Sequence, residues 1–245
     1  NNNDLAAVNA LNCITSLDLT NVTELTGDAL KFHDFNYNNL SQKLKTIKFP
    51  KNGGTIPTSC MEGWSIENVI IPAGYTTIGE KAFNTCRSLK IINIPEGITT
   101  ICDNAFNYSA IQSVRLPTSL LKIKQYAFVD CKDLASITIP NKVQSIGDYA
   151  FNNCDNLKDV YVLGTTTIPT IGYHAFSEKM MYNNGGACQY ATLDAYNAAV
   201  AEGTAKTVDR NLYWNDTYKY CMLHYPKDYA SSYIDVNIHD TYNLE

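Results

Sequence analysis

The sequence predicts a strand-rich α/β solenoid, in which short coils of similar sequence stack along one axis. Two recurring features predict it. Ala-Phe pairs recur with Phe-to-Phe spacings of 23, 22, 23 and 25 residues, at Ala82-Phe83, Ala105-Phe106, Ala127-Phe128, Ala150-Phe151 and Ala175-Phe176. Prolines keep the same period, at Pro50, Pro72, Pro95, Pro117 and Pro140. A fixed period of this length is typical of repeat architectures.

Each proline follows an apolar-x-apolar step, which predicts a short strand. The steps are Ile47/Phe49, Val69/Ile71, Ile92/Ile94, Val114/Leu116 and Ile137/Ile139, with Leu17/Leu19 before them and Val160/Val162 after them. A turn, an Ile-Gly step and a helical turn with the Ala-Phe pair then complete the coil. One coil buries too little apolar surface to fold alone, so we expect neighbouring coils to pair their strands into one parallel ladder.

Two units, Ile78 to Leu89 and Ile146 to Leu157, share the pattern I-G-x-x-A-F-N-x-C-x-x-L. This pattern, with the strand-Pro segments between, resembles the BspA-like leucine-rich repeats over about residues 44–176. The resemblance implies a right-handed leucine-rich-repeat horseshoe with short helical turns and one parallel concave sheet. It favours this fold over a parallel β-helix, the second architecture that the period fits. It also implies an extracellular or cell-surface protein that often works in adhesion.

The repeat pattern divides the chain into three parts. Residues 1–43 are predicted to form an atypical N-terminal capping repeat, and residues 44–176 form repeats of 22–25 residues. Residues 177–245 are predicted to form a C-terminal cap rich in tyrosine, since nine of the 17 tyrosines fall within 188–245. The alternative for this last segment is a carbohydrate-binding appendage, in which tyrosine rings stack on sugars.

The eight cysteines invite a disulfide or metal interpretation. Cys86, Cys131 and Cys154 each follow a repeat phenylalanine by three residues, and Ser109 holds the same place in another coil. We therefore expect a buried structural ladder of these thiols beside a second ladder of the repeat phenylalanines, Phe83, Phe106, Phe128, Phe151 and Phe176. A Cys131–Cys154 disulfide and a metal site at Cys221-x-x-His224 are the weaker alternatives.

Catalysis has no positive support in the sequence. It contains no nucleophile-elbow, phosphate-loop or zinc-protease motif, and its four histidines show no base–orienter arrangement. We expect a protein that is not an enzyme and that uses no cofactor and no metal.

Composition narrows the partners and the location. Nineteen basic against 24 acidic residues give a net charge of −5, without a basic run, which argues against nucleic acid. No apolar stretch approaches the roughly 20 residues that span a bilayer. Because the chain opens at Asn1 without an initiator Met or an apolar signal core, we expect a processed or trimmed product, and the missing leader does not argue against secretion. From the resemblance and the low content of charged residues, 18%, we expect a protein that is secreted or held at the cell surface, for example by a lipid on a removed N-terminus.

Alternation along each strand turns every second side chain outward, which predicts two columns of residues on the concave sheet. One column reads Asp18, Lys48, Ile70, Asn93, Arg115, Thr138, Tyr161, and the other Ser16, Thr46, Asn68, Ile91, Ser113, Ser136, Asp159. We expect a protein or glycan partner to bind here, because solenoids use such extended surfaces for binding. A merely solvated face is the alternative. The candidate binding residues are Lys48, Asn68, Ile70, Ile91, Asn93, Arg115, Thr138, Asp159 and Tyr161.

Overall fold

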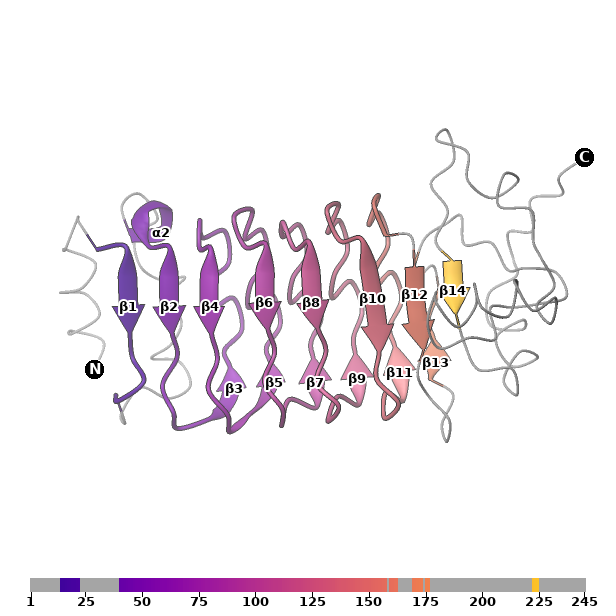
Figure 1. Ribbon diagram of the computed structural model, residues 1–245, viewed down its shortest axis with the longest axis horizontal. Helices are drawn as coiled ribbons and strands as arrows, with labels where there is room; N and C mark the ends of the chain where they lie inside the picture. Colours follow the sequence, from indigo (N-terminus) through magenta and orange to yellow (C-terminus); the bar gives the residue numbers. More distant parts are fainter. Residues whose placement is uncertain are drawn as a thin grey trace, which may run out of the picture.

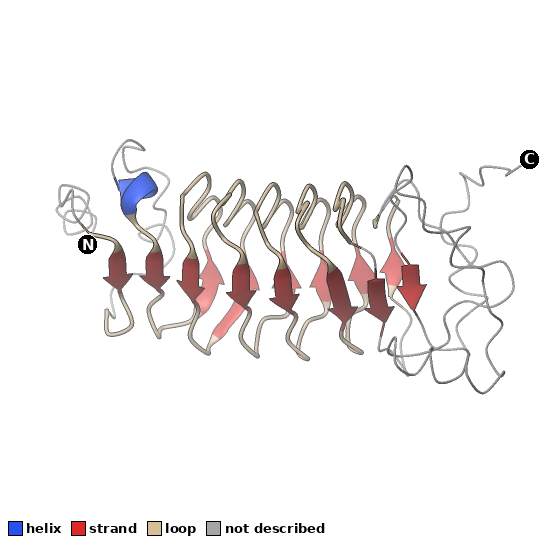
Figure 2. Ribbon diagram, turned by 45° about the horizontal axis from the view of Figure 1, so that its top comes forward, coloured by secondary structure: helices blue, strands red, loops and turns tan. Residues whose placement is uncertain are grey.

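The computed structural model is a solenoid in which each coil contributes strands to two parallel sheets on opposite sides of the axis (Figures 1 and 2). It describes residues 14–22, 40–157, 159–162, 169–173, 175–176 and 222–224. Most of the two predicted caps, 1–43 and 177–245, lies outside the described residues, so both caps stay predictions.

The first sheet contains the strands that the strand-proline steps predict. They are β1 (Ser16–Asp18), β2 (Thr46–Lys48), β4 (Asn68–Ile70), β6 (Ile91–Asn93), β8 (Ser113–Arg115), β10 (Ser136–Ile139), β12 (Asp159–Val162) and β14 (Met222–His224). The strands β1, β2, β4, β6 and β8 pair in this order in one stretch of the sheet, and β10, β12 and β14 pair in a second stretch. All of these pairs are parallel. Because β10 lies beside β8 in Figures 1 and 2, both stretches belong to one row.

A second parallel sheet, which the sequence analysis did not predict, lies behind the first. Its strands are β3 (Gly54–Ile56), β5 (Tyr75–Ile78), β7 (Thr100–Ile101), β9 (Lys122–Ile123), β11 (Ser145–Ile146) and β13 (Thr170–Ile171). Most of them have two residues, too few to show the alternation that identifies a strand. The leucine-rich-repeat solenoid is confirmed. Because the row of strands runs nearly straight in Figure 1, the outward side of the first sheet is called the first face below, not a concave face.

The turn segments with the Ala-Phe pairs differ from the helical turns that were expected. In the part of the chain that the structure describes, the only helix is α2 (Leu40–Lys43), outside these turns. The turns of the Met61 coil and of the first four Ala-Phe pairs instead hold left-handed residues with φ between 53° and 59°. These are Ser59, Lys81, Thr85, Asn104, Tyr108, Tyr126, Asp130, Tyr149 and Asn153. They interrupt helical winding, and the phenylalanine amides bond to the next coil: Phe83 N to Ala105 O and Phe106 N to Ala127 O, both at 2.8 Å.

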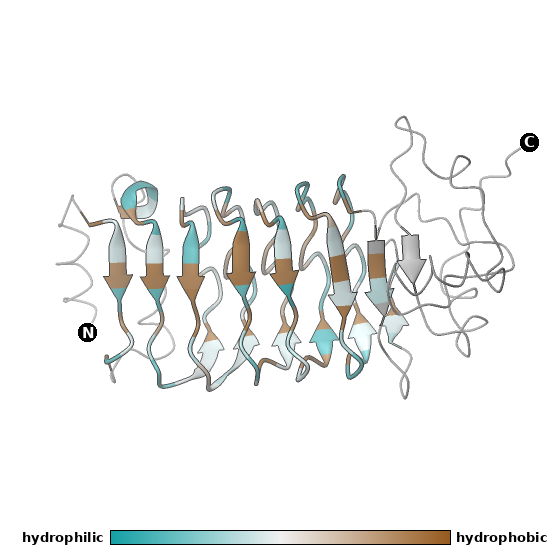
Figure 3. Ribbon diagram, viewed as in Figure 1, coloured by the Kyte–Doolittle hydropathy of each residue, from teal (hydrophilic) through white to brown (hydrophobic). Residues whose placement is uncertain are grey.

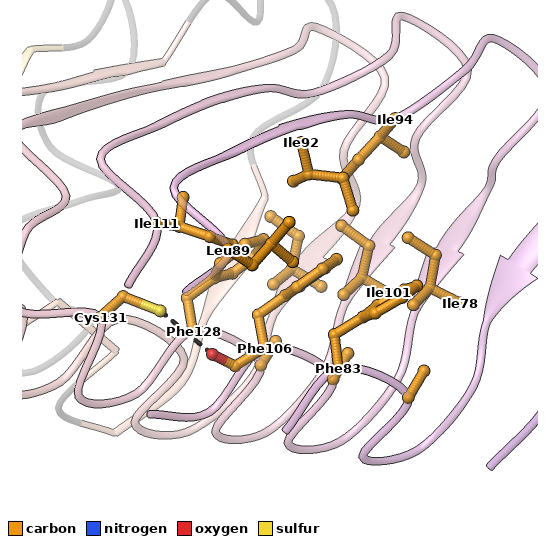
Figure 4. Packing of buried hydrophobic residues seen from close by; sticks show 14 of the residues in the cluster. Ile78, Phe83, Leu89, Ile92, Ile94, Ile101, Phe106, Ile111, Phe128 and Cys131 are labelled. Carbon is orange, nitrogen blue, oxygen red and sulfur yellow. Dashed lines mark hydrogen bonds between the residues drawn. The ribbon is translucent and has the colours of Figure 1, made fainter. Parts of the chain in front are cut away.

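The five repeat phenylalanines form one stacked column inside the solenoid, and Figure 4 shows Phe83, Phe106 and Phe128 of this column. Ring centroids of successive members lie 5.0 to 5.4 Å apart, with interplanar angles of 4° to 16°. This spacing is close to the roughly 4.8 Å between paired strands, so the rings stack at the repeat distance of the sheets. At the N-terminal end Met61 holds the phenylalanine place, and Phe49 packs edge-on against Phe83 at 6.3 Å.

The three ladder cysteines are buried beside this column, and each thiol lies near a carbonyl of the preceding coil. The Sγ atoms of Cys86, Cys131 and Cys154 are 3.1, 3.2 and 3.1 Å from the carbonyl oxygens of Met61, Phe106 and Phe128 (Figure 4 shows the second contact). Burial raises the pKa of Cys131 to about 12, and it also raises the pKa of Cys86. Neither Cys131 nor Cys154 forms a disulfide, so the alternative of a disulfide between them does not match the structure.

Glycines follow the second-sheet isoleucine where successive coils approach most closely. A Cβ atom on Gly79 would lie 2.3 Å from the Ile56 carbonyl oxygen, and one on Gly147 would lie 2.4 Å from the Gln125 amide nitrogen. Lys124 holds the same place in the coil before Gly147, so the close approach is local to certain coils. The glycine of the Ile-Gly step is therefore required by backbone proximity.

We predict that Gly147→Ala lowers the free energy of unfolding by about 1–3 kcal/mol, because the added methyl group forces the backbones of two coils apart. Urea denaturation measures the change. Lys124→Ala is the matched control and is expected to stay within about 0.5 kcal/mol of the parent, since its side chain is exposed. An unchanged midpoint for Gly147→Ala would show that the coils have room at this position.

Carboxylates also tie one coil to the next. Glu96 accepts hydrogen bonds from the Thr118 amide at 3.1 Å, the Thr118 hydroxyl at 3.0 Å and the Ser119 amide at 3.3 Å. These bonds, with the Thr118 amide first, hold the pKa of Glu96 below its ordinary value of 4.5. Asp103 plays a similar part, because its carboxylate accepts from the Gln125 amide at 3.0 Å.

We predict that Glu96→Gln lowers the melting temperature at neutral pH and weakens the loss of stability on acidification. The pKa of Glu96 is lower in the folded state than in the unfolded state. The Glu96 carboxylate therefore stabilises the fold fully above its unfolded-state pKa, and this stabilisation is lost as pH falls through its folded-state pKa. Melting curves between about pH 6 and pH 3 measure this. Glu80→Gln is the control, since Glu80 is exposed and contacts Lys81 at 3.8 Å. Equal acid sensitivity in Glu96→Gln and the parent would contradict the assignment.

Candidate functional site: the first face

The pairing register places the outward residues of the first five strands in the two predicted columns. One column contains Asp18, Lys48, Ile70, Asn93 and Arg115, each opposite the next on the neighbouring strand. In the other, Ser16, Thr46 and Asn68 lie on β1, β2 and β4, and Ile91 and Ser113 on β6 and β8. Successive members are about 5 Å apart, so all of them are within reach of one ligand.

The columns continue on the last three strands. Thr138 lies opposite Tyr161, and Ser136 opposite Asp159. Among the described strands no pairing joins β8 to β10, so Arg115 and Thr138 belong to separate paired stretches of the row. In the register, His224 of β14 lies opposite Tyr161. The signal for this strand was the Leu223-His224-Tyr225-Pro226 segment, which has the order of a strand followed by a proline.

Two isoleucines form the apolar part of the first face. Ile70 ends β4 and is 45% exposed, while Ile91 begins β6, the neighbouring strand, and is 66% exposed. In Figure 3 the carboxyl end of β4 and the amino half of β6 are both brown. Their inward neighbours Val69 and Ile92 are buried, so burial on the inner side is complete without the outward pair.

The charged residues at the N-terminal end of the face are paired with one another. Lys48 Nζ lies 3.0 Å from an Asp18 carboxylate oxygen, and Lys45 Nζ lies 3.3 Å from Glu67. The Thr20 hydroxyl and amide donate to Asp18 at 2.6 and 3.0 Å. These bonds, followed by Lys48, lower the pKa of Asp18 to about 2. The carboxylate is therefore ionised at every physiological pH, and the charge of Lys48 is compensated.

Among the described residues, no group of three or more His, Cys, Asp or Glu side chains is arranged to hold a metal ion. Within the same ranges, no helix has the length and apolar character that crossing a bilayer requires. The Cys221-x-x-His224 alternative and the tyrosine-rich segment lie largely outside the described residues, so neither is tested.

A comparison with known protein families shows the family to which the chain belongs. The family model described as "BspA type Leucine rich repeat region" matches in six copies, over residues 15–134 and 54–183, which together are more than half of the sequence. The chain belongs to this BspA-type leucine-rich repeat family. The matched copies of the BspA-type repeat include every strand of the first face from β2 to β12.

Solved structures with a similar shape come from bacterial leucine-rich repeat proteins. A leucine-rich repeat protein from Bacteroides ovatus is 22% identical, with a TM-score of 0.48, over 57% of this chain and 43% of the other. A leucine-rich cell surface protein from Faecalibacterium prausnitzii is 23% identical, with a TM-score of 0.44, over 65% and 50%. The BspA-type chain thus spans half or less of the length of these two proteins. No curated protein matches the sequence.

Proposed function

We propose that this BspA-type chain is an exported, non-catalytic interaction module that binds a partner through the first face, in the manner of an adhesin at the cell surface. The observation that carries the proposal is the exposure of Ile70 and Ile91 on adjacent strands of one face. Apolar side chains gathered in this way, with polar residues around them, are typical of interaction surfaces. The family and the low content of charged residues, 18%, support the surface location.

The rest of the first face has the chemistry of such a surface. Arg115 is exposed on β8, and Tyr161 is half-buried on β12. Arginine and tyrosine are the residue types that most often dominate binding energy at interfaces. The two sheets hold these side chains on a regular backbone, so a partner meets a surface that is ordered before binding.

The test is an array of extracellular-matrix proteins and glycans, probed with the purified chain and with a variant that combines Ile91→Ala, Arg115→Ala and Tyr161→Ala. We expect the variant to lose binding to whichever component the parent retains. The matched control combines Lys122→Ala, Gln144→Ala and Thr170→Ala, three exposed residues on and beside the second sheet. Equal binding by the parent and the first-face variant would remove this face as the binding surface.

A further inference from the structure

The apolar part of the first face is not required by the fold. Among the described residues only four large hydrophobic side chains are exposed, and two of them, Ile70 and Ile91, lie on adjacent strands. Other coils fill the same two columns with polar residues, for example Ser113 opposite Ile91. We call Ile70 and Ile91 the isoleucine patch. Because the fold accepts polar residues in these columns, the patch is a feature of the surface and not of the core.

Uncompensated positive charge lies on one side of the isoleucine patch. Lys90 directly precedes Ile91, and Arg115 ends β8, the strand beyond it. Neither side chain forms an ion pair or hydrogen bond with any residue that the structure describes, whereas Lys48 on the other side is held by Asp18 at 3.0 Å. The chain as a whole is acidic, with a net charge of −5. An anionic group is therefore attracted to the β6–β8 side of the patch, against the sign of the molecule.

The register sets the distance between the apolar and the cationic groups. Ile70 lies opposite Asn93, and Asn93 lies opposite Arg115, so Ile70 and Arg115 are two strand spacings apart in one column. Two spacings are about 10 Å, which is the span of about three residues of extended chain. A ligand that reaches both groups is consequently a short extended segment, with an aliphatic side chain and a carboxylate about three residues apart.

We infer that the first face binds an extended acidic segment of a partner protein, which places an aliphatic side chain on the isoleucine patch and a carboxylate on Arg115. This inference rests on the proposed function and names the chemistry of its partner. The segment runs across the strands of the first sheet, along the axis of the solenoid.

The test begins with a phage-displayed library of random dodecapeptides selected on the full chain. We expect enrichment of sequences in which an aliphatic residue and an aspartate or glutamate stand two to four positions apart. Synthetic versions of the enriched peptides are then titrated by fluorescence anisotropy at low and at high salt. Binding is expected to weaken as salt rises, because the Arg115 contact is exposed.

Three variants distinguish the parts of the inference. Ile91→Ser copies the residue of the neighbouring coil and is expected to weaken peptide binding roughly tenfold. Arg115→Gln is expected to weaken it roughly two- to fivefold and to reduce its salt dependence. Lys122→Gln removes the same charge on the second sheet and is expected to leave binding unchanged. Circular dichroism melting verifies that all three variants fold.

The outcomes separate this inference from the proposed function. If the selected peptides depend on Ile91 but carry no acidic residue, or if Arg115→Gln binds as the parent does, the acidic partner is wrong and the interaction face stands. If the selection yields no peptide, or if the peptides bind equally to Ile91→Ser, Arg115→Gln and the parent, the extended acidic segment is wrong, and the array with the first-face variant decides the proposed function separately. Enrichment of basic peptides would also overturn the inference.

Discussion

Every coil of this solenoid must keep the same distance from the next at three places around its circumference. Two of these places are the parallel sheets, and the third is the turn segment, where Phe83 and Phe106 donate their amides to the following coil at 2.8 Å. The phenylalanine rings stack inside the turns at 5.0 to 5.4 Å, close to the strand spacing. Because the three contacts share one period, a coil can neither tilt nor shift without breaking several of them.

This constraint explains which residues are invariant from coil to coil and which are free to differ. The inward places hold stacked phenylalanine, the adjoining alanine and a small thiol or hydroxyl such as Cys131 or Ser109, all buried. Gly147 is required where two backbones nearly touch. Outward places on the first sheet carry no such demand, so they differ in charge and polarity between coils. The outward residues of the first face can therefore differ to suit a binding partner without disturbing the packing between coils.

The sequence allowed part of this structure to be predicted. The spacing of Phe83, Phe106 and Phe128 identified the repeat, because one residue type fills each inward place. The second sheet was missed, since strands such as β7 and β9 have two residues each. The left-handed turns were missed as well. Glycine is the usual sign of a positive φ in a sequence, but these positions are filled by other residues, such as Lys81 and Thr85.

The candidate site, too, was predicted only in part from the sequence. Alternation along the strands predicted the columns that bring Ile70 and Arg115 onto one face, because a period of two residues is visible in the sequence. It did not predict that Asp18 neutralises Lys48 while Arg115 stays without a partner among the described residues. That difference depends on the conformations of long side chains, which no pattern of residue types determines.

Native-state hydrogen exchange tests the central claim most directly. If the turn segments form a third inter-coil ladder, the amides of Phe83, Phe106 and Phe128 should exchange as slowly as that of Gly79, which bonds to Ile56 O at 2.9 Å beside the second sheet. Rapid exchange of the three phenylalanine amides, alongside protected sheet amides, would contradict the account and leave the sheets as the sole connection between coils.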